Sequence, residues 1–138
     1  DNHSWFNQNH TLRMAEVLDS LGYLLREAKA RGLLERTVIL VSSEFGRPPY
    51  MNDKGTQEDP NKEGRDHWDV TSAMLIGGGI GDNRVIGATD GALGALPLES
   101  GRTMTMEALH VALRNHLNIN TKLKEKYPLL ETGMDFLT

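Results

Sequence analysis

Three short stretches of the sequence, DNHS, SSEFGRPPY and GRDHWD, concentrate carboxylate, imidazole and guanidinium groups. The candidate residues are Asp1, His3, Glu44, Arg47, Arg65 and His67. Carboxylates and neutral imidazoles are common ligands of divalent cations, and the planar guanidinium group of arginine suits phosphate or sulfate. These residue types therefore indicate a site that could hold a cation and an oxyanion.

The stretch SSEFGRPPY directly follows the apolar run TVILV. In open α/β sheets, ligands collect outside the carboxyl ends of strands, so Glu44 is well placed for a site if TVILV is a strand. Gly46 would allow a sharp turn, and Arg47 would offer several donors to an anion. The alternative interpretation is a Glu–Arg surface pair on an ordinary turn.

The other two stretches are less specific when each is taken alone. In GRDHWD, the Asp66 carboxylate could orient the His67 imidazole as a metal ligand, or the two could form a plain hydrogen-bonded pair. In DNHS, Asp1 and His3 could bind one cation only if the backbone between them bends. The remaining histidines, which we interpret as surface or packing residues of helices, are His10, His110 and His116.

Two helices and two strands are predicted to position these groups. Residues 8–31 carry apolar side chains at steps of three and four, typical of an amphipathic helix that ends near Arg31, before Gly32. That stripe contains Met14, Leu18, Leu21, Leu25 and Ala28. Residues 37–42 and 70–79 are apolar without polar alternation, which indicates strands covered on both faces.

Weaker signals follow in the second half of the chain. The glycines in GGGIG, at residues 77–81, predict a turn with unusual backbone angles rather than a phosphate loop, because the Lys-Ser/Thr of a P-loop is missing. Residues 84–89 are a further strand candidate. A helix is expected to begin at 104 or 105, with Thr105 as N-cap, and to end at Leu117. The inward side chains should be Leu109, Ala112, Leu113 and Leu117.

The polar segment at residues 45–68 connects the two predicted strands, and structureless loops of that length are uncommon unless they are functional or disordered. Glu44 follows the first strand, whereas His67 precedes the second. The two residues can therefore share a site only if the strands run antiparallel or the loop crosses back. We expect an antiparallel partner strand within a mostly parallel sheet.

Composition limits the possible partners. The chain has 19 acidic and 15 basic residues without a basic cluster, which argues against nucleic acid, and no apolar run approaches the length of a membrane span. The absence of cysteine excludes disulfides and thiolate chemistry. Since the first residue is Asp1 and not methionine, we expect the chain to be part of a longer protein.

Taken in order, the blocks DNHS, SSEFGRPP, GRDHW, GGG and VIGATD resemble a bacterial sulfatase-like family, domain of unknown function 1501, within the alkaline phosphatase superfamily. The resemblance runs from Asp1 to about Leu117. It implies an α/β fold with a mixed, mostly parallel sheet flanked by helices. Residues 1–138 would be a single domain, the carboxy-terminal part of a larger alkaline phosphatase-like domain.

The resemblance also implies roles for the candidate residues. Asp1, His3, Glu44 and His67 look like ligands of a divalent metal ion, such as zinc, calcium, magnesium or manganese. Arg47 and Arg65 would grip the anionic ester as catalytic residues. Phe45 stands where active relatives usually carry histidine, which suggests one metal or a degraded pair, and the nucleophile is expected upstream of Asp1 in the amino-terminal half.

The expected function is therefore metal-dependent hydrolysis of sulfate or phosphate esters by a protein of which this chain is the carboxy-terminal portion. Its substrate would be a small anionic ester or a sulfated or phosphorylated glycan. The alternative is a non-catalytic module that binds an anion or glycan and retains the fold. The resemblance further suggests a bacterial protein that is exported or periplasmic.

Overall fold

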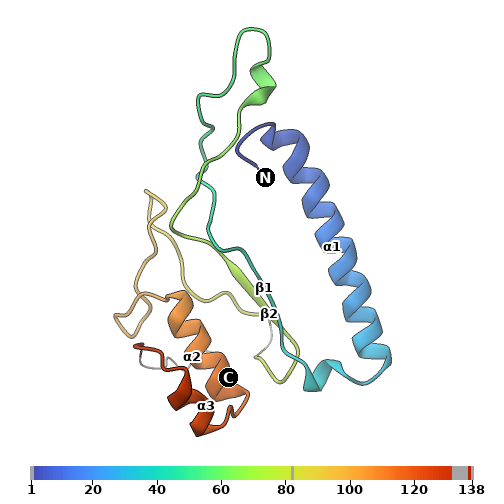
Figure 1. Cartoon of the computed structure of the whole chain (residues 1–138), viewed down its shortest axis with the longest axis vertical. Helices are drawn as coiled ribbons and strands as arrows, with labels where there is room; N and C mark the ends of the chain where they lie inside the picture. Colours follow the sequence, from blue (N-terminus) through green and yellow to red (C-terminus); the bar gives the residue numbers. More distant parts are fainter. Residues whose placement is uncertain (1, 82, 132–136, 138) are drawn as a thin grey trace. The chain divides into compact units, whose positions relative to one another are not determined.

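The computed structural model describes residues 2–81, 83–131 and 137 of the chain. These residues cluster into two compact units, which lie within Asp1–Gly79 and Ile80–Thr138. The first unit contains α1 (Phe6–Ala30), η1 (Leu34–Arg36), β1 (Ile39–Ser42), η2 (Pro60–Lys62) and β2 (Ala73–Ile76). The second unit contains α2 (Met106–His116) and α3 (Thr121–Lys126). Figure 1 shows the order of these elements along the chain.

The sheet differs from the expected one. In the described residues it consists of β1 and β2, which pair antiparallel with Ile39 opposite Ile76 and Ser42 opposite Ala73 (Figure 1). The predicted mixed, mostly parallel sheet flanked by helices is therefore wrong for this chain. The apolar runs correctly indicated strands, but a run of apolar residues carries no information on strand number or direction. Leu40 is 36% exposed and Met74 42%, so neither strand is covered on both faces.

The long helix α1 confirms the prediction for residues 8–31. It begins after Trp5, and Arg31 and Gly32 close it, with Gly32 at a φ of 64°. The apolar stripe is covered only toward the carboxyl end of the helix, where Ala28 is buried, whereas Leu18 is 55% exposed. Among the described residues, none of the helices combines the length and apolar character that a membrane-spanning segment needs.

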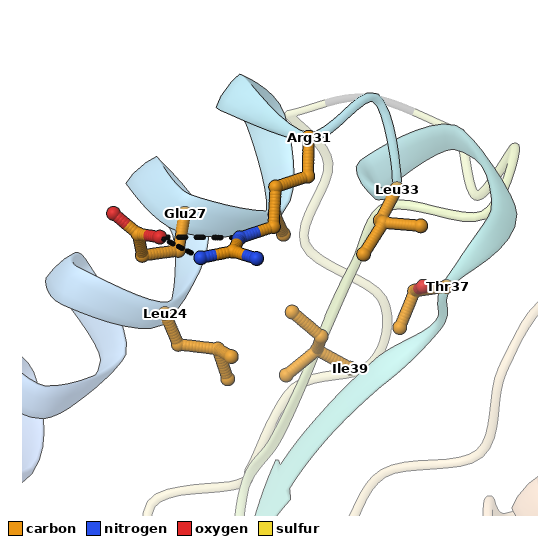
Figure 2. Close-up of a pocket in the computed structure, with 7 residues that line it drawn as sticks. Leu24, Glu27, Arg31, Leu33, Thr37 and Ile39 are labelled. Carbon is orange, nitrogen blue, oxygen red and sulfur yellow. Dashed lines mark hydrogen bonds and ion pairs between the residues drawn. The ribbon is translucent and has the colours of Figure 1, made fainter.

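An apolar cavity of about 280 Å³ separates the end of α1 from the start of β1. Figure 2 shows Leu24, Leu33 and Ile39 directed into it, while Glu27 and Arg31 form an ion pair on the helix beside it. Apart from Glu27 and Arg31, the residues that line the cavity carry no charged side chain.

In the second unit, α2 confirms the predicted helix, and the hydroxyl of Thr105 accepts a 3.0 Å hydrogen bond from the amide of Ala108. Leu109 and Ala112 are buried as expected, but Leu117 is 50% exposed, so its predicted inward position is wrong. Residues 84–89 form no strand and contribute only the isolated bridge between Thr89 and Ala95. The tail contains a further short helix, α3.

The turn after β2 has the predicted unusual geometry. Gly77, Gly78 and Gly79 have φ angles of 76°, 57° and 75°, in the left-handed region that side chains with a Cβ disfavour. The three glycines directly follow Ile76, the last residue of β2, and so end the strand.

Candidate functional site

The pairing of the two strands continues beyond their ends as an isolated bridge. The amide of Gly46 donates to the carbonyl of Trp68 at 2.8 Å, and the amide of Trp68 donates to the carbonyl of Gly46 at 2.9 Å. A Cβ on Gly46 would lie 1.8 Å from the carbonyl oxygen of Val70, so only glycine permits this approach. The bridge brings the residues that flank Gly46 close to His67, as the antiparallel arrangement requires.

The amino-terminal segment joins the same region through backbone hydrogen bonds. The amide of Phe6 donates to the carbonyl of Glu63 at 3.0 Å, and the amide of Arg65 donates to the carbonyl of Asn2 at 2.9 Å. His3 therefore lies against Gly64, where a Cβ would come within 2.1 Å of the His3 carbonyl carbon. The segment at residues 45–68 is thus held by two neighbours and is not a free loop.

Four side chains meet where these segments converge. The ring centroids of His3 and His67 are 4.7 Å apart, and the ring of Phe45 stacks on His67 at 3.7 Å with planes 24° apart. Arg47 places its Cζ 4.9 Å from the centroid of Phe45 and its Nη1 3.4 Å from Nε2 of His3. The same Nη1 donates to the carbonyl oxygen of Arg65 at 2.6 Å. We call His3, Phe45, Arg47 and His67 the imidazole–guanidinium cluster.

The guanidinium group of Arg65, the second predicted anion-binding residue, has a different position. Its Cζ lies 4.4 Å from the ring centroid of Phe6, at the start of α1. Its Nε is buried and has no hydrogen-bond acceptor among the residues that the structure describes. Arg65 therefore contributes its backbone carbonyl to the cluster, and its side chain lies at the start of α1.

The predicted metal ligands are only partly brought together. His3 and His67 are neighbours, whereas Asp1 lies outside the described residues. Glu44 is exposed, and its carboxylate has no partner among the residues that the structure describes. The sequence left open whether Asp66 orients His67 as a metal ligand or forms a plain hydrogen-bonded pair with it; the hydrogen bond that Asp66 Oδ1 accepts comes from the side chain of Asn52 at 3.0 Å.

The described residues of this region offer a metal ion two imidazoles but not a complete set of ligands. Within the described part of the chain, no three His, Asp or Glu side chains gather in a group that could hold a metal ion. Structural and catalytic zinc sites use at least three protein ligands, so His3 and His67 fit as part of such a site only. The described residues alone fit an anion better, because Arg47 brings a fixed positive charge against His3.

Asn52 is the residue of this region that sequence reasoning missed. It lies between the two prolines after Arg47 and the GRDHWD stretch, and its side chain reaches both the His3 carbonyl and Asp66. An asparagine in a polar loop is usually a turn residue, so its type gave no signal of this role.

A family described as "Protein of unknown function (DUF1501)" matches residues 1–128. The chain belongs to this family. The match covers the amino-terminal segment, the imidazole–guanidinium cluster and both helices α1 and α2 of this DUF1501 chain. Comparisons with curated proteins and with solved structures find no match to the chain.

Proposed function

We propose that this DUF1501 chain contributes part of the active site of a metal-dependent hydrolase of sulfate or phosphate esters, as in the alkaline phosphatase superfamily. The observation that carries the proposal is the convergence of His3, Arg47 and His67 from three separate segments. His67 is exposed, so burial in a core does not explain why it lies beside His3. A shared binding site for an ion would explain their proximity.

Arg47 is the group that would bind the negatively charged ester. One of its donors is fixed on the Arg65 carbonyl, and its position over Phe45 limits the orientations of the guanidinium plane. A fixed fork of donors favours a sulfate or phosphate group, because several N–H groups can reach its oxygens together. The Nε of Arg65 would provide a further donor if the ester approached the start of α1.

His3 and His67 would be two ligands of a divalent metal ion, and Asp1 and Glu44 are proposed to complete the set. Such an ion, when bound, supplies a Lewis acid for the ester oxygen and lowers the pKa of a bound oxygen nucleophile. Phe45 stacks on one face of His67 and so restricts the directions in which the ring nitrogens point. The nucleophile itself is proposed to come from outside this chain.

A second candidate function is a non-catalytic module that binds an anion or an anionic glycan. The stacking of Phe45 on His67 favours it, because this aromatic side chain occupies a position beside the imidazole where a further ligand would otherwise be available. In this case Arg47 would bind the anion through charge and hydrogen bonds alone, and no metal would be needed.

An activity assay on the full-length protein distinguishes the two functions. Aryl sulfate and aryl phosphate are supplied with zinc, manganese, magnesium or calcium, and again with a chelator. The hydrolase predicts metal-dependent release of the aryl alcohol, reduced about 10²–10³-fold in R47A, the loss typical of removing one donor to a transition-state anion. R36A, which removes an exposed arginine of η1, is the control. Sulfate binding without hydrolysis, unchanged by the chelator, would support the binding module instead.

A further inference from the structure

The carboxamide of Asn52 uses all of its hydrogen-bonding capacity on the segments that surround the cluster. Its Nδ2 donates to the carbonyl oxygen of His3 at 3.1 Å and to Oδ1 of Asp66 at 3.0 Å. Its Oδ1 accepts from the amide of Gly64 at 3.0 Å and from the amide of Lys54 at 3.4 Å. A carboxamide has two donor hydrogens and two acceptor lone pairs, so every one of them is engaged.

These four bonds differ in what they connect. The bond to Lys54 spans two residues and belongs to an ordinary turn, in which an asparagine oxygen commonly accepts from the backbone. The bonds to His3, Gly64 and Asp66 instead reach two other segments of the chain. A residue needed only for the turn would require none of these three.

We propose that Asn52 is a positioning residue that holds His3 beside His67, a role in the site that rests on the proposed function. On one side it fixes the backbone carbonyl of His3, and on the other it fixes Asp66, the residue before His67. The backbone amide of Asn52 also donates a 2.8 Å hydrogen bond to the carbonyl of Gly64, which lies against the His3 backbone in the stretch that contains Asp66. The separation of the two imidazoles is therefore set through Asn52.

Close backbone packing at Gly64 explains why this link must be a short side chain with both donors and acceptors. The His3 backbone lies so near Gly64 that a Cβ would overlap it, and the amide of Gly64 points to Asn52. Aspartate at position 52 would keep the acceptor for Gly64 and Lys54 but lose both donated bonds, and it would face the Asp66 carboxylate with a like charge. N52D thus removes the link to His3 and Asp66 while leaving the turn bonds.

NMR spectroscopy of the chain with labelled histidines tests this role without any ester or metal. In the wild type we expect a nuclear Overhauser effect between the ring protons of His3 and His67. A second effect, across the Gly46–Trp68 bridge, reports that the strand pairing is intact. N52D is expected to lose the first effect and keep the second, and N61A, which changes an exposed asparagine of η2, should keep both.

The double variant N52D/D66N separates the two donated bonds of Asn52. It restores a hydrogen bond between positions 52 and 66 with donor and acceptor exchanged, but the His3 carbonyl still lacks its donor. We expect the His3–His67 effect to remain absent. The proposal is overturned if N52D keeps this effect at wild-type intensity, or if N52D also loses the Gly46–Trp68 effect, which would make Asn52 a general requirement for folding.

Failure of the proposed hydrolase function would give a different result from failure of the positioning role of Asn52. The wild-type full-length protein would then show no ester hydrolysis, while the His3–His67 effect and its dependence on Asn52 would persist.

Discussion

His3 and His67 lie with their ring centroids 4.7 Å apart, with planes inclined by 58°. Neither residue is close to the other in the sequence, and no strand or helix contains either of them. Their proximity depends on backbone contacts at Gly46 and Gly64 and on the side chain of Asn52. Changes at these supporting positions should therefore alter the site without touching a ring.

Gly64→Ala should separate the amino-terminal segment from the GRDHWD stretch. The added Cβ would lie 2.1 Å from the His3 carbonyl carbon, a backbone atom that cannot rotate away. Overpacking of this kind costs about 1–3 kcal/mol, so the free energy of unfolding measured in urea should fall by that amount. Gly91→Ala is the matched control, because a Cβ there meets nothing within 4 Å. Equal stability of the two variants would contradict the close packing at Gly64.

Arg47→Lys should weaken anion binding although it keeps the positive charge. Lysine has no planar fork, so it cannot donate to the Arg65 carbonyl and still present a fixed face to an oxyanion. We expect the Kd for inorganic sulfate or phosphate, measured by calorimetry, to rise about tenfold, which corresponds to about 1.4 kcal/mol. R36K serves as the control in η1. An unchanged Kd in R47K would show that anion binding depends on the positive charge alone and not on the guanidinium geometry.

Phe45→Leu should release the His67 ring while leaving an apolar side chain in place. The aromatic ring stacks on His67 at 3.7 Å, so its ring current should shift the His67 ring protons upfield in the wild type. Proton NMR of F45L should show these signals near the positions of an exposed histidine such as His110. The loss of the stacking pair should also lower stability by about 0.5–1.5 kcal/mol. Identical His67 shifts in both proteins would contradict the stack.

Thr105→Ala should destabilise α2 without affecting the imidazole–guanidinium cluster. Its hydroxyl caps the helix by accepting from Ala108, and loss of such a cap costs about 1 kcal/mol. Thr105→Ser keeps the hydroxyl and should keep most of that stability. Thermal unfolding followed by circular dichroism measures the difference. A Thr105→Ala variant that unfolds like Thr105→Ser would refute the capping role.

Local signals in the sequence predicted the helices well. The spacing of apolar residues together with Gly32 located α1, and the hydroxyl of Thr105 located the start of α2. These features act within one or two turns of helix, so they are readable without knowledge of the rest of the fold. The glycines after β2 were likewise recognised, because left-handed backbone angles select that residue type.

Long-range features were predicted less completely. The requirement that Glu44 and His67 be linked by antiparallel strands identified the pairing of β1 with β2, but the apolar runs wrongly suggested a larger parallel sheet. The sequence also could not reveal that Asn52 bonds to His3, since this contact depends on three segments meeting. Residue type identifies chemistry, whereas the partners of a side chain depend on the tertiary arrangement.

The central claim is that His3, Arg47 and His67 form one binding site, and a histidine-detected NMR titration tests it most directly. The chain is titrated with inorganic phosphate, first with a chelator and then with zinc, while the ring signals of all histidines are followed. We predict that the signals of His3 and His67 shift together with a single Kd, that R47A abolishes the shifts, and that His110 stays unchanged. Independent shifts of His3 and His67, or no shift of either ring in both conditions, would contradict a common site.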